Sequence, residues 1–209
     1  MLIFVYMMKA ANLQLSPEEM RLVSDPGWIL TKNSIIVKVV QLFAGLSEEY
    51  RSVAEGGATP EEGRAAGRWN DLAGPKISKG ENYRGLPYVM LDYPRLFGKE
   101  DVLAIRTMFW WGHAFSTTLH LKGCYQELCL PVIRERWDLL AACGFHISVG
   151  EDEWRHEHVP ENYLPMEGPP GEGERPFLKL SARCGLDQWG EAPAILTGHF
   201  RVLMDVLIP

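Results

Sequence analysis

Few cysteines occur in this 209-residue sequence, and their spacing supports neither a metal site nor a disulfide framework. The four of them, Cys124, Cys129, Cys143 and Cys184, form no C-x-x-C pair and no zinc-finger pattern. We therefore expect free thiols that are buried or partly buried, as is usual for unpaired cysteine. Because free thiols are typical of a reducing compartment, the cytoplasm is the expected location.

The sequence also lacks the charge excess and the motifs that would identify a function. Its 21 lysines and arginines are outnumbered by 27 aspartates and glutamates, and the net charge of −6 argues against broad nucleic-acid binding. It argues equally against binding to an anionic membrane surface. No G-x-S-x-G, H-E-x-x-H, G-x-G-x-x-G or G-x-x-x-x-G-K-[ST] motif is present. The sequence therefore names no reaction, and no cofactor is expected.

The apolar start of the chain, MLIFVYMMKAA, is short. It cannot span a membrane, and no basic residues precede it as they would in a signal peptide. We expect neither a transmembrane segment nor a membrane partner. Residues 1–7 either form a short edge strand or precede a true translation start at Met7 or Met8.

The composition, with 46% apolar and 23% charged residues, is that of an ordinary globular protein. The length suits a single α+β domain over residues 1–209. Its N-terminal part, about 16–54, is expected to be helical, because SPEE at 16–19 is a helix capping box and apolar residues recur at helical spacing from about 26 to 54. The sheet and the remaining helices are expected in a body over about 76–207.

Alternation of apolar and polar residues predicts several strands that follow one another directly. The predicted strands are 86–93, 102–111, 114–121, 145–149 and 177–183. Helices are predicted over 123–143, regular from Pro131, and over 188–207, with a long surface loop over 151–175. This order favours an α+β fold, in which an antiparallel sheet of about four to five strands has helices packed on one face, giving two layers. Gly112 makes either a turn or a bulge, and the facing of His113 depends on which.

The same alternation divides the strand residues between two faces of the sheet. The helix-covered face is predicted to be apolar and to carry Val89, Leu91, Ile105, Phe109, Trp111, Phe145, Ile147, Leu178 and Leu180. The opposite face is polar, aromatic and cationic, with Tyr88, Asp92, Arg106, Met108, Trp110, Ser116, Thr118, His120, His146, Lys179 and Arg183. This second set is either a ligand or partner surface or a plain exposed face with long side chains that snorkel.

An anion site is predicted beside the first strand. The segment KISKGENYRG, residues 76–85, contains glycines that would let backbone N–H groups approach an anion, and cationic side chains that supply charge. The structural alternative is a surface connection with local turns. We predict that a small cytoplasmic ligand-binding or regulatory protein holds an anionic molecule with Lys79, Tyr83, Arg84, Tyr88, Arg95, Arg106 and Trp110.

Two other functions stay open. A hydrolase or transferase would use His113 or His120 with Asp92 as acid–base groups, with or without a metal. The metal ligands would be His156 and His158, which lie on one side of an extended segment but have no evident third ligand. A structural protein would instead pair its open sheet face in a homodimer.

The runs KISKGENYRGLPYVMLDYPRLF and AIRTMFWWGHAFSTTLHLKG resemble conserved hypothetical proteins of bacteria that have no assigned function. The resemblance covers roughly residues 76–207, including the closing FLKLSARCGLDQW segment. It implies a bacterial cytoplasmic α+β protein and brings no catalytic residues with it.

Overall fold

The computed structural model describes residues 14–56, 73–169 and 175–207. The chain divides into two compact units, with the boundary between Lys38 and Val39. Residues 1–7, for which an edge strand or a later start is predicted, lie outside the described residues.

The first unit contains the predicted helix start. Helix α1, Pro17–Val23, is capped by Ser16, whose Oγ accepts from the Glu19 N–H at 3.2 Å while Glu19 Oε2 accepts from the Ser16 N–H at 2.7 Å. This reciprocal pair is the capping box expected from the sequence. Helix α2, Pro26–Gly56, begins next and continues into the second unit.

Helix α2 is long and apolar enough to cross a membrane by length and composition, and no other helix in the described residues is. This criterion is weak evidence, because core helices of soluble proteins and signal sequences also meet it. The part of α2 in the second unit has the properties of a core helix. Val39, Phe43, Leu46 and Tyr50 recur every three or four residues and are at most 2% exposed. The Tyr50 ring stacks on Phe200 with centroids 3.8 Å apart.

The second unit is built on an antiparallel sheet that has seven strands within the described residues, in the order β1-β2-β3-β4-β7-β5-β6. The strands are β1 (Lys76–Tyr83), β2 (Leu86–Phe97), β3 (Val102–Trp110), β4 (Ala114–Lys122), β5 (His146–Ser148), β6 (Tyr163–Pro165) and β7 (Phe177–Gly185). The α+β class and the antiparallel sheet are confirmed, but the predicted number of four to five strands is wrong.

The two additional strands lie where the sequence favours loops. Strand β1 is rich in lysine, glycine, glutamate and asparagine, which are poor strand formers, yet it pairs with β2 along most of its length. Strand β6 is only three residues long and lies in a segment rich in proline and glutamate. Strand β2 also continues past Pro94, because a register shift between Asp92 and Arg95 accommodates the proline.

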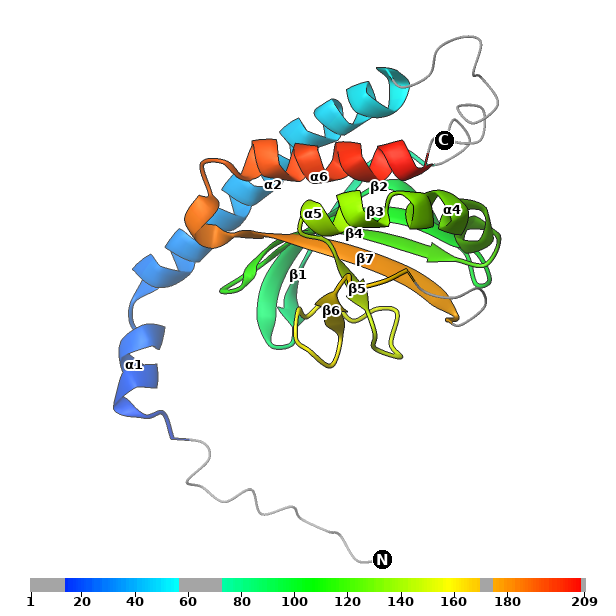
Figure 1. Ribbon diagram of the computed structural model, residues 1–209. Coiled ribbons are helices and arrows are strands. Elements are labelled where there is room, and N and C mark those ends of the chain that lie inside the picture. The colour runs from blue at the N-terminus through cyan, green and yellow to red at the C-terminus, as the bar shows by residue number, and fades with distance from the viewer. Residues whose placement is uncertain (1–13, 57–72, 170–174, 208–209) are drawn as a thin grey trace, which may run out of the picture. The chain divides into compact units, whose positions relative to one another are not determined.

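The helices of the second unit cover one face of this sheet (Figure 1). Within the described residues they are the part of α2 after Lys38, α4 (Cys124–Glu135), α5 (Trp137–Ala142), the short 3-10 helix η2 (Leu186–Gln188) and α6 (Ala192–Leu207). Helices α4 and α6 both contact β4, and α6 also contacts β3 and β7. The face toward these helices carries apolar residues that include Leu91, Ile105 and Leu180, each fully buried.

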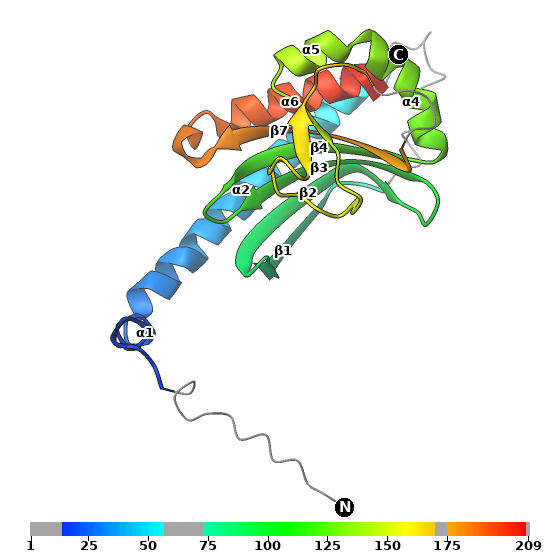
Figure 2. The ribbon, with the colours of Figure 1, turned by 60° about the horizontal axis from the view of Figure 1, so that its bottom comes forward.

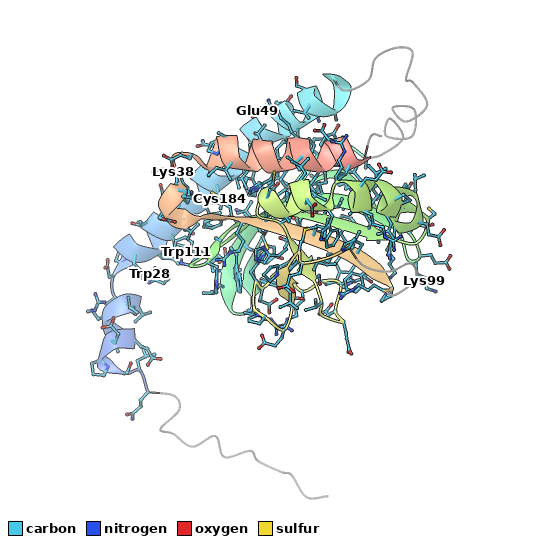
Figure 3. All side chains as sticks on the ribbon, in the orientation of Figure 1. Trp28, Lys38, Glu49, Lys99, Trp111 and Cys184 are labelled. Carbon is cyan, nitrogen blue, oxygen red and sulfur yellow. The ribbon has the colours of Figure 1, made fainter. Side chains whose placement is uncertain are left out.

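Gly112 lies in a tight turn between β3 and β4, with φ of 73°. The His113 N–H donates to the Trp110 carbonyl at 3.1 Å, and Trp110 pairs with Ala114. The register of the hairpin is uninterrupted, so Gly112 is a turn and not a bulge. Figure 3 places the neighbouring Trp111 at the same end of the sheet as Cys184 of β7, with Lys99 at the opposite end.

The sheet face opposite α4 and α6, called the second face below, has the predicted membership. Cross-strand pairs share a face, and the register aligns Asp92, Arg106 and Thr118 in one row across β2, β3 and β4. Residues 149–162, between β5 and β6, fold over this face, as Figure 2 shows from that side. We call them the covering segment. The prediction of a surface loop is wrong here, since Asn162 is fully buried and Glu157 is 9% exposed.

Candidate functional site

A buried ammonium group holds the covering segment against the sheet. Lys179 of β7 is 1% exposed, and its Nζ donates to the carbonyls of Glu153 at 2.9 Å and Arg155 at 2.7 Å. Burial, together with the positive charge of Arg106, lowers the pKa of Lys179 to about 7. Because both bonds go to backbone oxygens, the lysine fixes the path of the chain rather than a particular side chain.

A second anchor joins β2 and β3 to the covering segment. Arg106 donates from Nε and Nη2 to the two oxygens of Asp92, and its Nη1 lies 3.2 Å from His156 Nε2. Since arginine can only donate, His156 Nε2 accepts, and its Nδ1 carries the proton of the neutral ring. Burial, with Lys179 and Arg106 nearby, lowers the pKa of His156 well below its usual value. Its Nδ1 is buried without a hydrogen-bond partner among the described residues.

A third anchor involves the carboxylate of Glu153. His120 Nε2 lies 3.0 Å from Glu153 Oε2, and Lys122 Nζ donates to Oε1 at 2.9 Å. Burial and the charge of Lys179 lower the pKa of His120 to about 4, although Glu153 acts in the opposite direction. His120 is therefore a neutral, largely buried residue that supports the covering segment.

The β1–β2 hairpin supplies a clamp from the side. Arg84 and Gly85 both have positive φ, of 52° and 82°, in a two-residue turn that directs the hairpin tip toward Glu157. Glu157 Oε1 accepts from Arg84 Nε, and Oε2 accepts from the Tyr83 hydroxyl at 2.6 Å. Burial raises the pKa of Glu157, but hydrogen bonds from Tyr83, the backbone and Arg84 outweigh it and lower the pKa to about 2. The negative charge of Glu157 is thus paired within the protein and is not available to a ligand.

A cavity of about 190 Å³ remains between the second face and the covering segment. Its floor contains Met108, Ser116 and Arg183, which are direct cross-strand neighbours in β3, β4 and β7. The volume is well above the roughly 30 Å³ that one water molecule occupies in the liquid. A small organic molecule therefore has room to enter.

One wall of the cavity is aromatic. The rings of Trp110 and His113 stack with centroids 3.5 Å apart and planes 8° from parallel. Trp110 Nε1 donates to the Tyr83 carbonyl at 3.2 Å, which fixes the indole. One face of the indole is covered by His113, so the exposed His113 ring is the outer layer of this stack.

The opposite wall contains His158. Its Nε2 lies 2.9 Å from Ser181 Oγ, and its ring stacks on Tyr163 with centroids 4.4 Å apart. Burial, Arg183, His146 and Lys179 lower the pKa of His158 to about 3, so the ring is neutral at pH 7. A second cavity of about 420 Å³ shares His158 and Arg183 and extends the concavity toward β5 and β6.

Two polar side chains in the cavity are available to a ligand. The side chain of Arg183 is exposed and has no ion pair or hydrogen bond in the part of the chain that the structure describes. Its neighbour Ser116 is buried, and its hydroxyl likewise has no protein hydrogen bond within residues 14–56, 73–169 and 175–207. A guanidinium beside a hydroxyl is a good binding site for an oxyanion.

The structure brings together only part of the predicted anion site. Tyr83, Tyr88 and Trp110 form an aromatic cluster on the second face, with Tyr83 5.2 Å from Trp110 and 6.1 Å from Tyr88. Arg84 and Arg106 lie near them but are paired with carboxylates.

The other two predicted cations do not join this cluster. Lys79 pairs with the buried Val89 and so belongs to the helix-covered face. Arg95 pairs with Ala104 and so shares the second face, but its Nε donates to the Gly74 carbonyl at 2.9 Å.

The candidate acid–base and metal-binding residues do not come together in one site. His113 and His120 lie at opposite ends of β4, about 23 Å apart at the rise of an antiparallel strand. Both oxygens of Asp92 are occupied by Arg106. His156 and His158 direct their Nε2 atoms to different partners, and the described residues contain no group of three or more side chains able to hold a metal.

The cavity residues that the sequence does not single out as site candidates are Ser116 and Arg183. Both are assigned to the second face by alternation, but nothing in the sequence shows that β4 pairs with β7. That pairing is what makes the two residues direct cross-strand neighbours.

Comparison with known proteins identifies no relative. No family model, no curated protein and no solved structure matches this chain. The resemblance of residues 76–207 to bacterial hypothetical proteins stays a prediction.

Proposed function

We propose that the protein is a small bacterial, cytoplasmic ligand-binding or regulatory protein that holds an anionic molecule in the cavity beneath the covering segment. The observation that carries the proposal is Arg183, a guanidinium at the cavity that has no partner within the described residues. The other arginines around the cavity, Arg84 and Arg106, are paired with carboxylates. Arg183 therefore supplies the cavity with an uncompensated positive charge.

The electrostatic environment supports an anion. Burial is the largest cause of the lowered pKa of His158, and the nearby groups Arg183, His146 and Lys179, cationic when protonated, lower it further. This second, electrostatic contribution is of the sign that favours a negative charge at the same place. The four free cysteines support a reducing location.

Ser181 and His158 have the 2.9 Å separation of a nucleophile and its base. Ser181 is 1% exposed, does not line the described cavities, and already bonds Thr118 at 2.8 Å. We therefore assign this pair to structure. A hydrolase or transferase that uses His113 or His120 with Asp92, with or without a metal, stays a prediction. The structural homodimer also stays a prediction.

Thermal-shift screening of the full chain against anionic metabolites and inorganic anions tests the proposal, since a ligand that prefers the native state raises apparent stability. We expect at least one anion to stabilise the wild type and to lose about tenfold or more in affinity with Arg183→Gln. The matched control is Arg201→Gln, which removes an exposed arginine from α6 on the other side of the sheet. Equal stabilisation of all three proteins would contradict the proposal.

A further inference from the structure

The cavity also defines the chemical class of its ligand, an inference that rests on the proposed function. The anion-binding end is the pair Ser116 and Arg183. Directly opposed residues of antiparallel strands have Cβ atoms about 4.5–5.5 Å apart. A guanidinium offers two parallel N–H groups that match the two oxygens of a carboxylate, and the hydroxyl adds a third donor.

The charge balance favours a single negative charge. Arg183 is the one arginine among the described residues that line the cavity, and the histidines of the covering segment are neutral at pH 7 because burial lowers their pKa values. Glu157 also lines the cavity, but its negative charge is paired with Arg84. A second negative charge on the ligand would therefore find no second arginine or lysine among the described lining residues. A dicarboxylate, or phosphate as its dianion, is a poor match.

The rest of the cavity is suited to a flat apolar group. Met108, Ala114 and Val159 supply apolar surface, and His113 presents a ring whose other face is already stacked on Trp110. A planar group placed on His113 would extend this stack by one layer, in the offset or parallel geometry that aromatic groups prefer. The volume of about 190 Å³ has room for a small ring.

We infer that the ligand is a small aromatic monocarboxylate, with its carboxylate on Arg183 and Ser116 and its ring against His113. Inorganic phosphate and a carboxylate without a ring each lack one of these two features. A neutral aromatic amide lacks the charge while keeping the shape.

Calorimetric titration of the full chain with four probes tests this assignment: benzoate, benzamide, acetate and inorganic phosphate. We expect benzoate to bind roughly tenfold or more tightly than each of the other three. Arg183→Gln should abolish the preference for benzoate over benzamide. His113→Ala should abolish the preference for benzoate over acetate, and Arg201→Gln should change neither.

The outcomes separate this inference from the proposed function. If phosphate or acetate binds as tightly as benzoate and depends on Arg183, the cavity binds anions but the aromatic monocarboxylate class is wrong. Benzamide binding as tightly as benzoate would overturn the role of charge. If none of the probes and no anion of the wider screen binds in an Arg183-dependent manner, both the inference and the proposed function fail. Both mutated side chains are exposed, so the variants should fold.

Discussion

Arg106 donates to both carboxylate oxygens of Asp92, from Nε at 2.6 Å and from Nη2 at 3.0 Å. The two side chains are 16% and 7% exposed, so this pair lies largely out of water. Its remaining nitrogen, Nη1, reaches His156 in the covering segment. The pair therefore links two strands of the sheet to the segment above them and is not available to bind an anion.

Asp92→Asn should destabilise the protein strongly, because it leaves Arg106 as a buried charge with no carboxylate. Removing one partner of a buried ion pair typically costs about 3–5 kcal/mol. Urea denaturation measures the change, and Asp205→Asn, at an exposed position on α6, should change the free energy of unfolding by less than about 0.5 kcal/mol. Equal stabilities of the two variants would show that the Asp92 pair contributes little.

Glu157→Gln should loosen the covering segment without unfolding the sheet. The substitution keeps the shape of the side chain but replaces the oxygen acceptors of Tyr83 and Arg84 with one oxygen and one donor. Lost hydrogen bonds to a charged group are worth about 1.5–3 kcal/mol, so local opening should become roughly tenfold or more frequent. Amide hydrogen exchange should accelerate in residues 149–162 and stay unchanged in β3 and β4.

The control for this experiment is Glu161→Gln, an exposed glutamate of the same covering segment. It changes the charge by the same amount and should leave exchange unaltered. If both variants accelerate exchange equally, net charge and not the clamp governs the motion of the segment.

Mild acid should destabilise the fold through His120 and His158. Their pKa values in the folded protein, about 4 and about 3, lie below the ordinary value of 6.5. Between these limits the unfolded chain binds more protons, so the free energy of unfolding falls as pH falls below about 6.5. Each histidine contributes a slope of at most about 1.4 kcal/mol per pH unit.

Urea denaturation between about pH 7 and pH 4.5 measures this slope before most carboxylates titrate. The double variant His120→Gln/His158→Gln should reduce it and leave the part due to His156, whose pKa is also lowered, whereas His113→Gln, at an exposed position in the β3–β4 turn, should not reduce it. A double variant with the wild-type slope would assign the acid sensitivity to other groups.

The faces of the sheet could be predicted from the sequence because the period of a strand is two and the chain keeps that period through the hairpin. Arg106, Trp110 and His120 were placed on one face by alternation alone, and the turn at Gly112 preserves that register. The polarity of each strand residue indicates which face of the sheet its side chain is on, so the neighbouring strands need not be known.

The proposed binding pair, Ser116 and Arg183, could not be predicted, because it depends on which strands are neighbours. Strand β7 lies between β4 and β5, so Arg183 pairs with Ser116 although the two are far apart in the sequence. The covering segment was missed for a different reason. Lys179 holds it by donating hydrogen bonds to the backbone carbonyls of Glu153 and Arg155. Because every residue has a backbone carbonyl, the sequence does not show which ones accept these bonds.

Raising the pH above 7 should stabilise the protein through Lys179. Its pKa in the folded protein is about 7, against an ordinary value of 10.5, because burial disfavours the ammonium form. Between these two values the unfolded chain holds more protons than the folded one, so the free energy of unfolding rises with pH. The slope is at most about 1.4 kcal/mol per pH unit.

The window from about pH 7 to pH 8 reports mainly on this lysine, because histidine titrates below it and tyrosine above it, while the cysteines contribute equally to wild type and variant. Lys179→Met retains much of the side-chain volume but has no proton to lose, so its unfolding free energy should lack the rise with pH that Lys179 contributes. The informative quantity is the slope and not the absolute stability, since methionine also removes the bonds to the two carbonyls. Lys99→Met, at an exposed position in the β2–β3 turn, should retain the wild-type slope. A Lys179→Met slope equal to that of wild type would mean that the buried ammonium keeps its proton throughout, and that its carbonyl contacts outweigh its burial.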